Sequence, residues 1–209
     1  RVAATYALME CFIAFTAQHS EKIRALREQT KNAVKTQEQF PLNWAADMTQ
    51  HDLYTYKGYT AGMKPSGVSG LPRLYYDRSK PYEKQIKIYN TFLPRDFVTK
   101  PEAYIIPQGW WAVTELLQLN GVKMRRFARD TVIIVEAYKI EQYNTGQRPY
   151  EKHYLHTGTT VSASKQTIKF LKGDYYVPMD QAANRYLIET LEPQAGDSFF
   201  AWNFFDAIL

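Results

Sequence analysis

The sequence predicts a mainly β chain of the α+β class, an antiparallel β-sandwich accessory domain preceded by a long N-terminal helix. Aromatic residues make up 15% of the 209 residues and include sixteen tyrosines, which favours strands. From residue 82 onward, short apolar and alternating segments recur between turn residues, as in antiparallel sheets. The first eighteen residues instead carry apolar side chains at helical spacing, and the helix turns polar beyond them.

Residues 1–40 are predicted to form a terminal helix that belongs to an upstream peptidase domain. Its apolar side chains recur at helical spacing, and further ones widen the stripe: Val2, Leu8, Met9, Phe12, Ile13 and Phe15. A helix that is apolar on most sides is normally buried on most sides. The sequence also begins in helical register without a methionine. We therefore expect this helix to pack against a domain that precedes it.

Residues 41–81 are predicted to form an irregular connecting segment with short strands, such as residues 55–59. Glycine and proline, which usually mark turns, recur in it: Gly58, Gly62, Pro65, Gly67, Gly70 and Pro72. A structureless connection of this length is uncommon in a compact domain unless it has a role of its own. We expect this segment to wrap over a neighbouring domain.

Residues 82–209 are predicted to form the β-sandwich accessory domain with short helices. A helix is expected at residues 110–119, because its apolar positions are helical and Asn120-Gly121 is a typical helix end. Several antiparallel strands with few helices favour a sandwich. The expected strands are residues 84–89, 102–106, 122–128, 130–143, 152–164 and 167–171.

The last third of the chain combines a strand, a helix and an aromatic tail. Residues 175–177 are the expected strand, and Asp180 is the expected N-cap of a helix over residues 181–191. Pro193 ends this helix, since a residue before proline avoids the α region. Four phenylalanines and one tryptophan then fall within residues 198–205. Because each ring buries roughly 150–250 Å² when packed, this tail must dock into an apolar surface.

Charge and cysteine content exclude several classes of partner. The net charge of +5 is modest, and its densest basic cluster, residues 123–129, is accompanied by no nucleic-acid-binding motif. We interpret this cluster as a solvated strand edge and predict no nucleic-acid partner. Cys11 is alone, which excludes an internal disulfide and a cysteine-based zinc site. No apolar run has the length of a membrane span, so none is predicted.

No catalytic, cofactor-binding or metal-binding residue is assigned within these 209 positions. None of the four histidines begins an HEXXH motif, and His153 and His156 would point to opposite faces of one strand. They are interpreted as structural or interfacial. Ser69 lacks the G-x-S-x-G context of a nucleophile elbow. Glu189 and Glu192 lie at helical spacing and are interpreted as part of a solvated face rather than as an acid–base pair.

Aromatic side chains offer one candidate ligand surface, made of Trp110, Trp111, Tyr175 and Tyr176. Exposed aromatic rings can stack on sugars, and this surface motivates an alternative function as a carbohydrate- or cell-wall-binding module. At helical spacing, however, at least one of the two tryptophans is expected in the core. A structural interaction domain is the further alternative.

Five segments carry a family resemblance: residues 104–111 (YIIPQGWW), 119–126, 148–156, 183–195 and 197–206. They resemble the C-terminal region of bacterial, Bacteroidetes-type zinc metallopeptidases of the carboxypeptidase A kind. The resemblance covers most of the chain from about residue 82. The opening helix resembles the helix that follows the catalytic glutamate near the end of their α/β peptidase domain.

The resemblance implies peptide hydrolysis by a parent metallocarboxypeptidase and an accessory, non-catalytic role for this part. In that family, zinc is held by a His-x-x-Glu pair and a later histidine, with a glutamate as general base. None of these motifs occurs in the sequence, so zinc and its ligands are expected upstream. The implied partners are the upstream peptidase domain and a peptide or glycan. The implied location is secreted or periplasmic.

Overall fold

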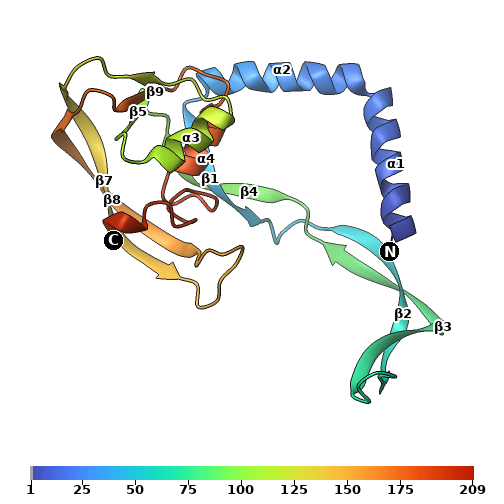
Figure 1. The fold of residues 1–209 in the computed structure, drawn as a ribbon. Helices are drawn as coiled ribbons and strands as arrows, with labels where there is room; N and C mark the ends of the chain where they lie inside the picture. The colour runs from blue at the N-terminus through green and yellow to red at the C-terminus, as the bar shows by residue number, and fades with distance from the viewer. Residues whose placement is uncertain (1) are drawn as a thin grey trace. The chain divides into compact units, whose positions relative to one another are not determined.

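The computed structural model describes residues 2–209, so Arg1 of the expected helix lies outside the described residues. The chain divides into two compact units, of which the smaller is Trp44–Arg95. The larger unit combines the residues up to Asn43 with Asp96–Leu209. Within residues 2–209 strands predominate, four α-helices accompany them, and the ladders β2–β3, β5–β9, β6–β9 and β7–β8 are antiparallel (Figure 1). The predicted fold class, mainly β within α+β, is therefore confirmed.

The strands are organised in four small sheets. In the described part of the chain, three sheets have two strands and one has three, with β9 at its centre. The sheets are β1 (Gln39–Ala46) with β4 (Phe92–Thr99), β2 (Asp52–Pro65) with β3 (Pro72–Ile88), β5 (Ala103–Ile106) and β6 (Arg125–Arg126) around β9 (Tyr175–Pro178), and β7 (Thr131–Thr145) with β8 (His156–Phe170). The predicted packing of two sheets into a sandwich is not confirmed. In a sandwich one face of β7 would be covered by a second sheet, but its apolar Val132 and Ile134 are exposed.

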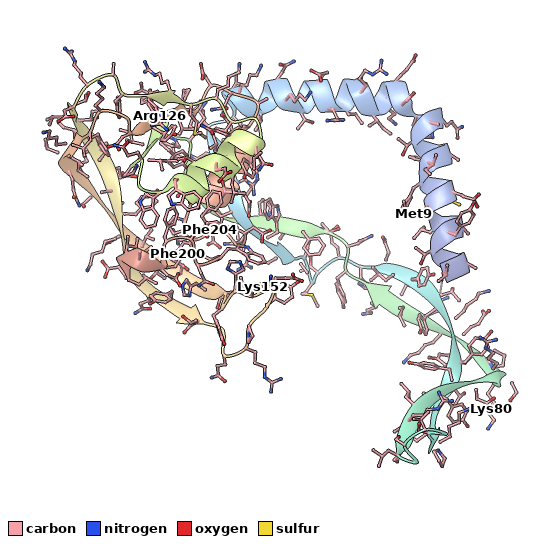
Figure 2. The ribbon with its side chains drawn as sticks, in the orientation of Figure 1. Met9, Lys80, Arg126, Lys152, Phe200 and Phe204 are labelled. Carbon is pink, nitrogen blue, oxygen red and sulfur yellow. The ribbon has the colours of Figure 1, made fainter. Side chains whose placement is uncertain are left out.

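The expected N-terminal helix consists of two helices, α1 (Val2–Gln18) and α2 (Ser20–Thr36). The chain leaves helical geometry at His19, whose φ of −107° and ψ of 18° separate the two. Among the described residues of α1 none is buried, and Met9 is one of its exposed apolar side chains (Figure 2). No helix in the described range is both long and apolar enough to cross a membrane.

The expected irregular connection at residues 41–81 contains long strands instead. β2 and β3 form one antiparallel ribbon whose register runs from Asp52 opposite Ile88 to Pro65 opposite Pro72. Of the glycines that suggested turns, Gly67 and Gly70 lie in the loop between the strands, whereas Gly58 and Gly62 lie inside the ladder. A Cβ added at Gly58 would lie 2.8 Å from the ring of Tyr82 on the opposite strand. Glycine therefore makes room for a cross-strand tyrosine here rather than ending the strand.

Three further expectations differ from the structure. The strands predicted at residues 152–164 and 167–171 are one continuous strand, β8, because Lys165 and Gln166 stay in the ladder with β7. The strand predicted at residues 122–128 is reduced to β6. The last helix, α4 (Asn184–Leu191), begins three residues later than expected, and Asp180 is not its N-cap. Instead, the Gln181 backbone N–H donates to Oδ1 of Asn184, the first residue of α4.

Two helix ends agree with the sequence. Helix α3 (Trp111–Leu119) is followed by Asn120 and then by Gly121, whose φ of +74° is the left-handed conformation that glycine adopts at low cost. Helix α4 ends before Glu192, whose φ of −80° and ψ of 117° are extended, as expected before Pro193.

The core of the larger unit lies where α3, α4, β9 and the aromatic tail meet. Its most buried apolar side chains come from five separate segments: Phe40, Val113, Leu117, Val177, Leu187, Ile188 and Phe200. The tail ends in a 3-10 turn, η1 (Asp206–Ile208). Phe199 and Phe200 are buried, and Phe204 packs on the core (Figure 2). The prediction that the tail docks into an apolar surface is confirmed, and its own chain supplies that surface.

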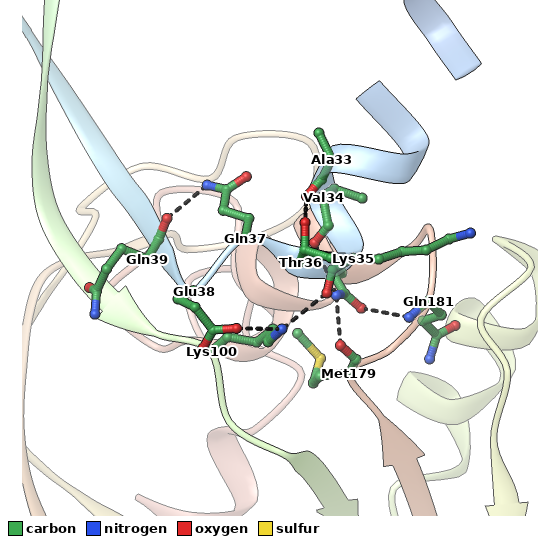
Figure 3. A network of polar contacts seen from close by, with 11 residues as sticks. Ala33, Val34, Lys35, Thr36, Gln37, Glu38, Gln39, Lys100, Met179 and Gln181 are labelled. Atoms are coloured by element: carbon green, nitrogen blue, oxygen red, sulfur yellow. Dashed lines mark hydrogen bonds and ion pairs between the residues drawn. The ribbon is translucent and has the colours of Figure 1, made fainter. Parts of the chain in front are cut away.

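Polar contacts fasten the last turn of α2 to this core (Figure 3). Asn184 is fully buried, and its side-chain amide donates to Val34 O at 3.2 Å and to Met179 O at 2.7 Å. Lys100 donates to Lys35 O at 3.0 Å and pairs with Glu38 at 3.1 Å. Carbonyl groups at a helix end have no partner within the helix, so these donors satisfy them and fix the end of α2 in place.

Candidate functional site

The four aromatic residues of the expected ligand surface occupy different environments. Trp111 begins α3 and is 69% exposed, whereas Trp110 packs edge-on against Phe205 with ring centroids 4.9 Å apart. Tyr175 and Tyr176 are neighbours in β9, where successive side chains point to opposite faces. Tyr175 is buried and Tyr176 is half-buried. The structure therefore leaves Trp111 and Tyr176 accessible, buries Tyr175, and packs the partly buried Trp110 against the core.

Arginines from β6 cover the tyrosines of β9, its antiparallel neighbour. The guanidinium of Arg126 lies 4.5 Å from the ring centroid of Tyr175 and also donates to the hydroxyl of Tyr175. The guanidinium of Arg125 lies 4.3 Å from the ring centroid of Tyr176. Such cation–π contacts contribute roughly 0.5–1 kcal/mol at exposed sites. A sugar stacking on this face of Tyr176 would have to displace Arg125.

Sequence reasoning did not connect these arginines with the tyrosines. Arg125 and Arg126 were part of the basic cluster interpreted as a solvated strand edge, and both are indeed exposed. Their contacts depend on cross-strand register, which joins positions about fifty residues apart and leaves no periodic signal in the sequence.

A buried carboxyl group lies at the end of α4. Glu192 is only 4% exposed, and the hydroxyl of Tyr104 on β5 donates to its Oε1. The hydroxyl of Tyr138 on β7 also forms a hydrogen bond with it. Burial raises the pKa of Glu192 above its usual range, although both tyrosine hydrogen bonds oppose this shift. Burial is the main cause that raises the pKa of Tyr138 to about 12, and the negative charge of Glu192 is the second cause. The same two causes raise the pKa of Tyr104.

The interpretation of Glu189 and Glu192 as one solvated face is therefore wrong for Glu192. Glu189 pairs with Arg185 one turn earlier on α4, whereas Glu192 lies inside the unit. Raised carboxyl pKa values occur at catalytic sites, but buried structural networks produce them as well. The partners of Glu192 come from β5 and β7, so the cluster joins three elements that are distant in sequence.

His153 and His156 lie in different surroundings. His153 precedes β8, and its ring lies 5.4 Å from that of Trp202 and 6.2 Å from that of Phe204. His156 is buried, with Nδ1 3.1 Å from Thr145 Oγ1 and Nε2 3.1 Å from Asp206 Oδ1. These contacts join β7, β8 and the tail, as expected for structural histidines.

The resemblance to zinc peptidases raises the question of which side chains could hold a metal ion. Throughout residues 2–209, no three His, Cys, Asp or Glu side chains are grouped so that they could hold a metal ion. The residues described by the structure do not fit a zinc site.

The fold and these clusters define a mainly β chain whose buried polar groups connect its elements. The sequence is similar to Carboxypeptidase 2 of Trichophyton tonsurans, with 27% identity over 140 residues, 59% of this chain and 26% of the relative. It is similar to the same extent to Carboxypeptidase 2 of Trichophyton equinum. The chain thus spans about a quarter of the length of these relatives. No protein-family model matches the sequence, and no solved structure matches it.

These similarities indicate a distant relationship to carboxypeptidases. Both relatives are fungal proteins, whereas the resemblance noted in the sequence was to bacterial ones. The relationship concerns part of each relative and does not assign a catalytic residue to this chain.

Proposed function

We propose that this chain is a non-catalytic accessory part of a carboxypeptidase-related protein, packed beside a peptidase domain. The observation that carries the proposal is the 27% identity over 140 residues to two proteins named as carboxypeptidases. In this proposal the zinc ion, its ligands and the general base belong to an upstream peptidase domain. The parent protein hydrolyses peptides and is secreted or periplasmic.

Helix α1 is the proposed contact with that peptidase domain. Its apolar side chains surround the helix and are exposed along its whole described length, including Tyr6, Phe12, Ile13 and Phe15. A contiguous apolar surface of this kind typically marks an interaction site. The end of α2 is fixed to the core through Asn184, so α1 is connected to a structured element rather than to a loose tail.

The central experiment compares this chain with the longer parent protein. Each is incubated with zinc and a blocked dipeptide that ends in phenylalanine, and release of the free amino acid is measured. We expect release by the parent protein and none by the 209 residues, together with no zinc binding by the 209 residues near micromolar concentration. Amino-acid release by the 209 residues alone would refute the proposal.

A second experiment tests the packing of α1. The peptidase domain, produced separately, is mixed with this chain and complex formation is measured by analytical ultracentrifugation. The variant Ile13→Asp places a charge on α1 and should abolish the complex. Leu119→Asp, an exposed position at the end of α3, is the matched control and should leave the complex intact. Equal association of both variants would contradict a role for α1.

Trp111 supports a second candidate function, capture of a carbohydrate or cell-wall glycan. Its indole is largely exposed at the start of α3 and is free to stack on a sugar ring. A glycan array should then show saturable binding that is lost in Trp111→Ala. Binding that survives this substitution would remove the candidate.

A further inference from the structure

The tip of the β2–β3 hairpin presents apolar side chains at the end of a ribbon. The loop between the strands spans residues 66–71 (Figure 1), and Val68 within it is 100% exposed. Leu71 in the same loop is also exposed, as are Met63 and Leu74, which lie opposite each other in the part of the ladder next to the loop. An apolar cluster at a convex loop end is costly in water unless it meets an apolar phase.

Two like charges lie directly behind this apolar tip. Lys64 and Arg73 are opposite each other in the ladder, an arrangement that destabilises a strand pair. Lys64 lies 4.9 Å above the ring of Tyr75, and in the described part of the chain neither cation forms an ion pair. An anionic group near both cations would relieve their repulsion.

The smaller unit as a whole is also positively charged. Trp44–Arg95 contains eight lysines and arginines against four aspartates and glutamates, which is most of the excess positive charge of the chain. Lys80, farther along β3, is exposed, although its ammonium pairs with Asp77 at 3.7 Å (Figure 2). Electrostatic attraction to a negatively charged surface follows from this excess.

We propose that the hairpin tip docks on an anionic phospholipid surface. Val68 and Leu71 enter the boundary between headgroups and acyl chains, and Lys64 and Arg73 contact lipid phosphates. From the tip backward, the apolar Val68 and Leu71 come first and the cationic Lys64 and Arg73 follow, as acyl chains and phosphates do in a bilayer. Met63 and Leu74 lie behind the cations, followed by the aromatic Tyr75 and Tyr76. A phospholipid surface is favoured over an acidic protein because it offers an apolar phase next to a layer of phosphates, which matches an apolar tip followed by two cations.

Vesicle co-sedimentation of the 209-residue chain tests the proposal. We expect binding to vesicles of phosphatidylcholine with phosphatidylglycerol, little binding to phosphatidylcholine alone, and weakening as sodium chloride is raised. Arg73→Glu replaces the repulsive cross-strand pair with an attractive one, so the hairpin stays folded while binding falls about tenfold or more. Arg24→Glu on α2 makes the same change in net charge and should reduce binding far less.

A second pair of variants separates the tip from the exposed apolar helix. Val68 is fully exposed, so Val68→Asp should remove vesicle binding without changing the far-ultraviolet circular dichroism spectrum. Phe12→Asp on α1 should leave binding unchanged. Loss of binding in Phe12→Asp but not in Val68→Asp would overturn the proposal, as would equal binding to both kinds of vesicle. Absence of vesicle binding would also overturn it and would favour an acidic protein partner.

Discussion

Replacing Asn184 by alanine should destabilise the larger unit more than any exposed substitution. The side chain is 0% exposed, and it makes three hydrogen bonds to backbone groups. Its amide donates to Val34 O and Met179 O, and its Oδ1 accepts from the Gln181 N–H at 3.2 Å. Alanine removes all three partners at once from the junction of α2, β9 and α4.

The magnitude follows from the three backbone groups that lose their partner. Leaving a buried donor or acceptor unsatisfied costs about 1–3 kcal/mol. Local relaxation and water entry recover part of this sum, so we expect a loss of about 3–5 kcal/mol in the free energy of unfolding. Such values are exceptional for single substitutions and arise when a buried hydrogen-bond network is broken. The loss is a large fraction of the roughly 5–15 kcal/mol that stabilises a typical domain.

Urea unfolding followed by tryptophan fluorescence measures this loss. The matched control is Asn32→Ala on the exposed surface of α2, which should change the free energy of unfolding by no more than about 0.5 kcal/mol. A loss below about 1 kcal/mol for Asn184→Ala, with an unchanged dependence on urea, would refute the reasoning. It would mean that the end of α2 is not held by this amide.

Three further predictions concern other junctions. Gly121→Ala should lower stability by about 1 kcal/mol in thermal unfolding, because its φ of +74° is unfavourable for a residue with a Cβ. Lys100→Met should cost about 1–3 kcal/mol in urea unfolding, because Lys35 O loses a charged donor. For Glu192, the raised pKa means that stability is full below the unfolded value of about 4.5 and declines as pH rises through the folded value. Glu192→Gln should therefore gain stability relative to the natural sequence as pH rises from about 4.5 to 8, measured by urea unfolding at several pH values.

Each of these predictions has a clear contrary outcome. An unchanged melting temperature for Gly121→Ala would indicate that the chain can leave the left-handed conformation there without strain. An unchanged stability for Lys100→Met would show that water replaces the ammonium at the end of α2. A pH dependence of Glu192→Gln parallel to that of the natural sequence would show that the carboxyl does not titrate differently in the folded chain.

Local signals in the sequence predicted several elements correctly. The spacing of apolar residues and the Asn120-Gly121 pair located α3 and its end. Pro193 located the end of α4, and the density of phenylalanine in the tail predicted its burial. These features depend on neighbouring residues alone, such as the conformational limits before proline or the freedom of glycine.

The β2–β3 ribbon could not be predicted in the same way. Glycine and proline usually end strands, and eight of them fall within residues 41–81. Gly58 and Gly62 are tolerated because Tyr82 and Tyr75 of the opposite strand lie against them. Pro65 and Pro72 lie at the last paired positions of the ladder. The deciding contacts thus lie between strands and depend on a register that the sequence does not state.

The polar clusters also depend on contacts between residues that are far apart in the sequence. Asn184 bonds to a residue 150 positions away, Tyr104 to Glu192 across 88 positions, and His156 to Asp206 across 50. Asn184, Glu192 and His156 belong to residue types that often serve in catalysis, but here they connect segments that are distant in sequence. Loss of one partner in such a network lowers stability. The two contact surfaces proposed for this chain, on α1 and at the hairpin tip, consist instead of exposed apolar side chains.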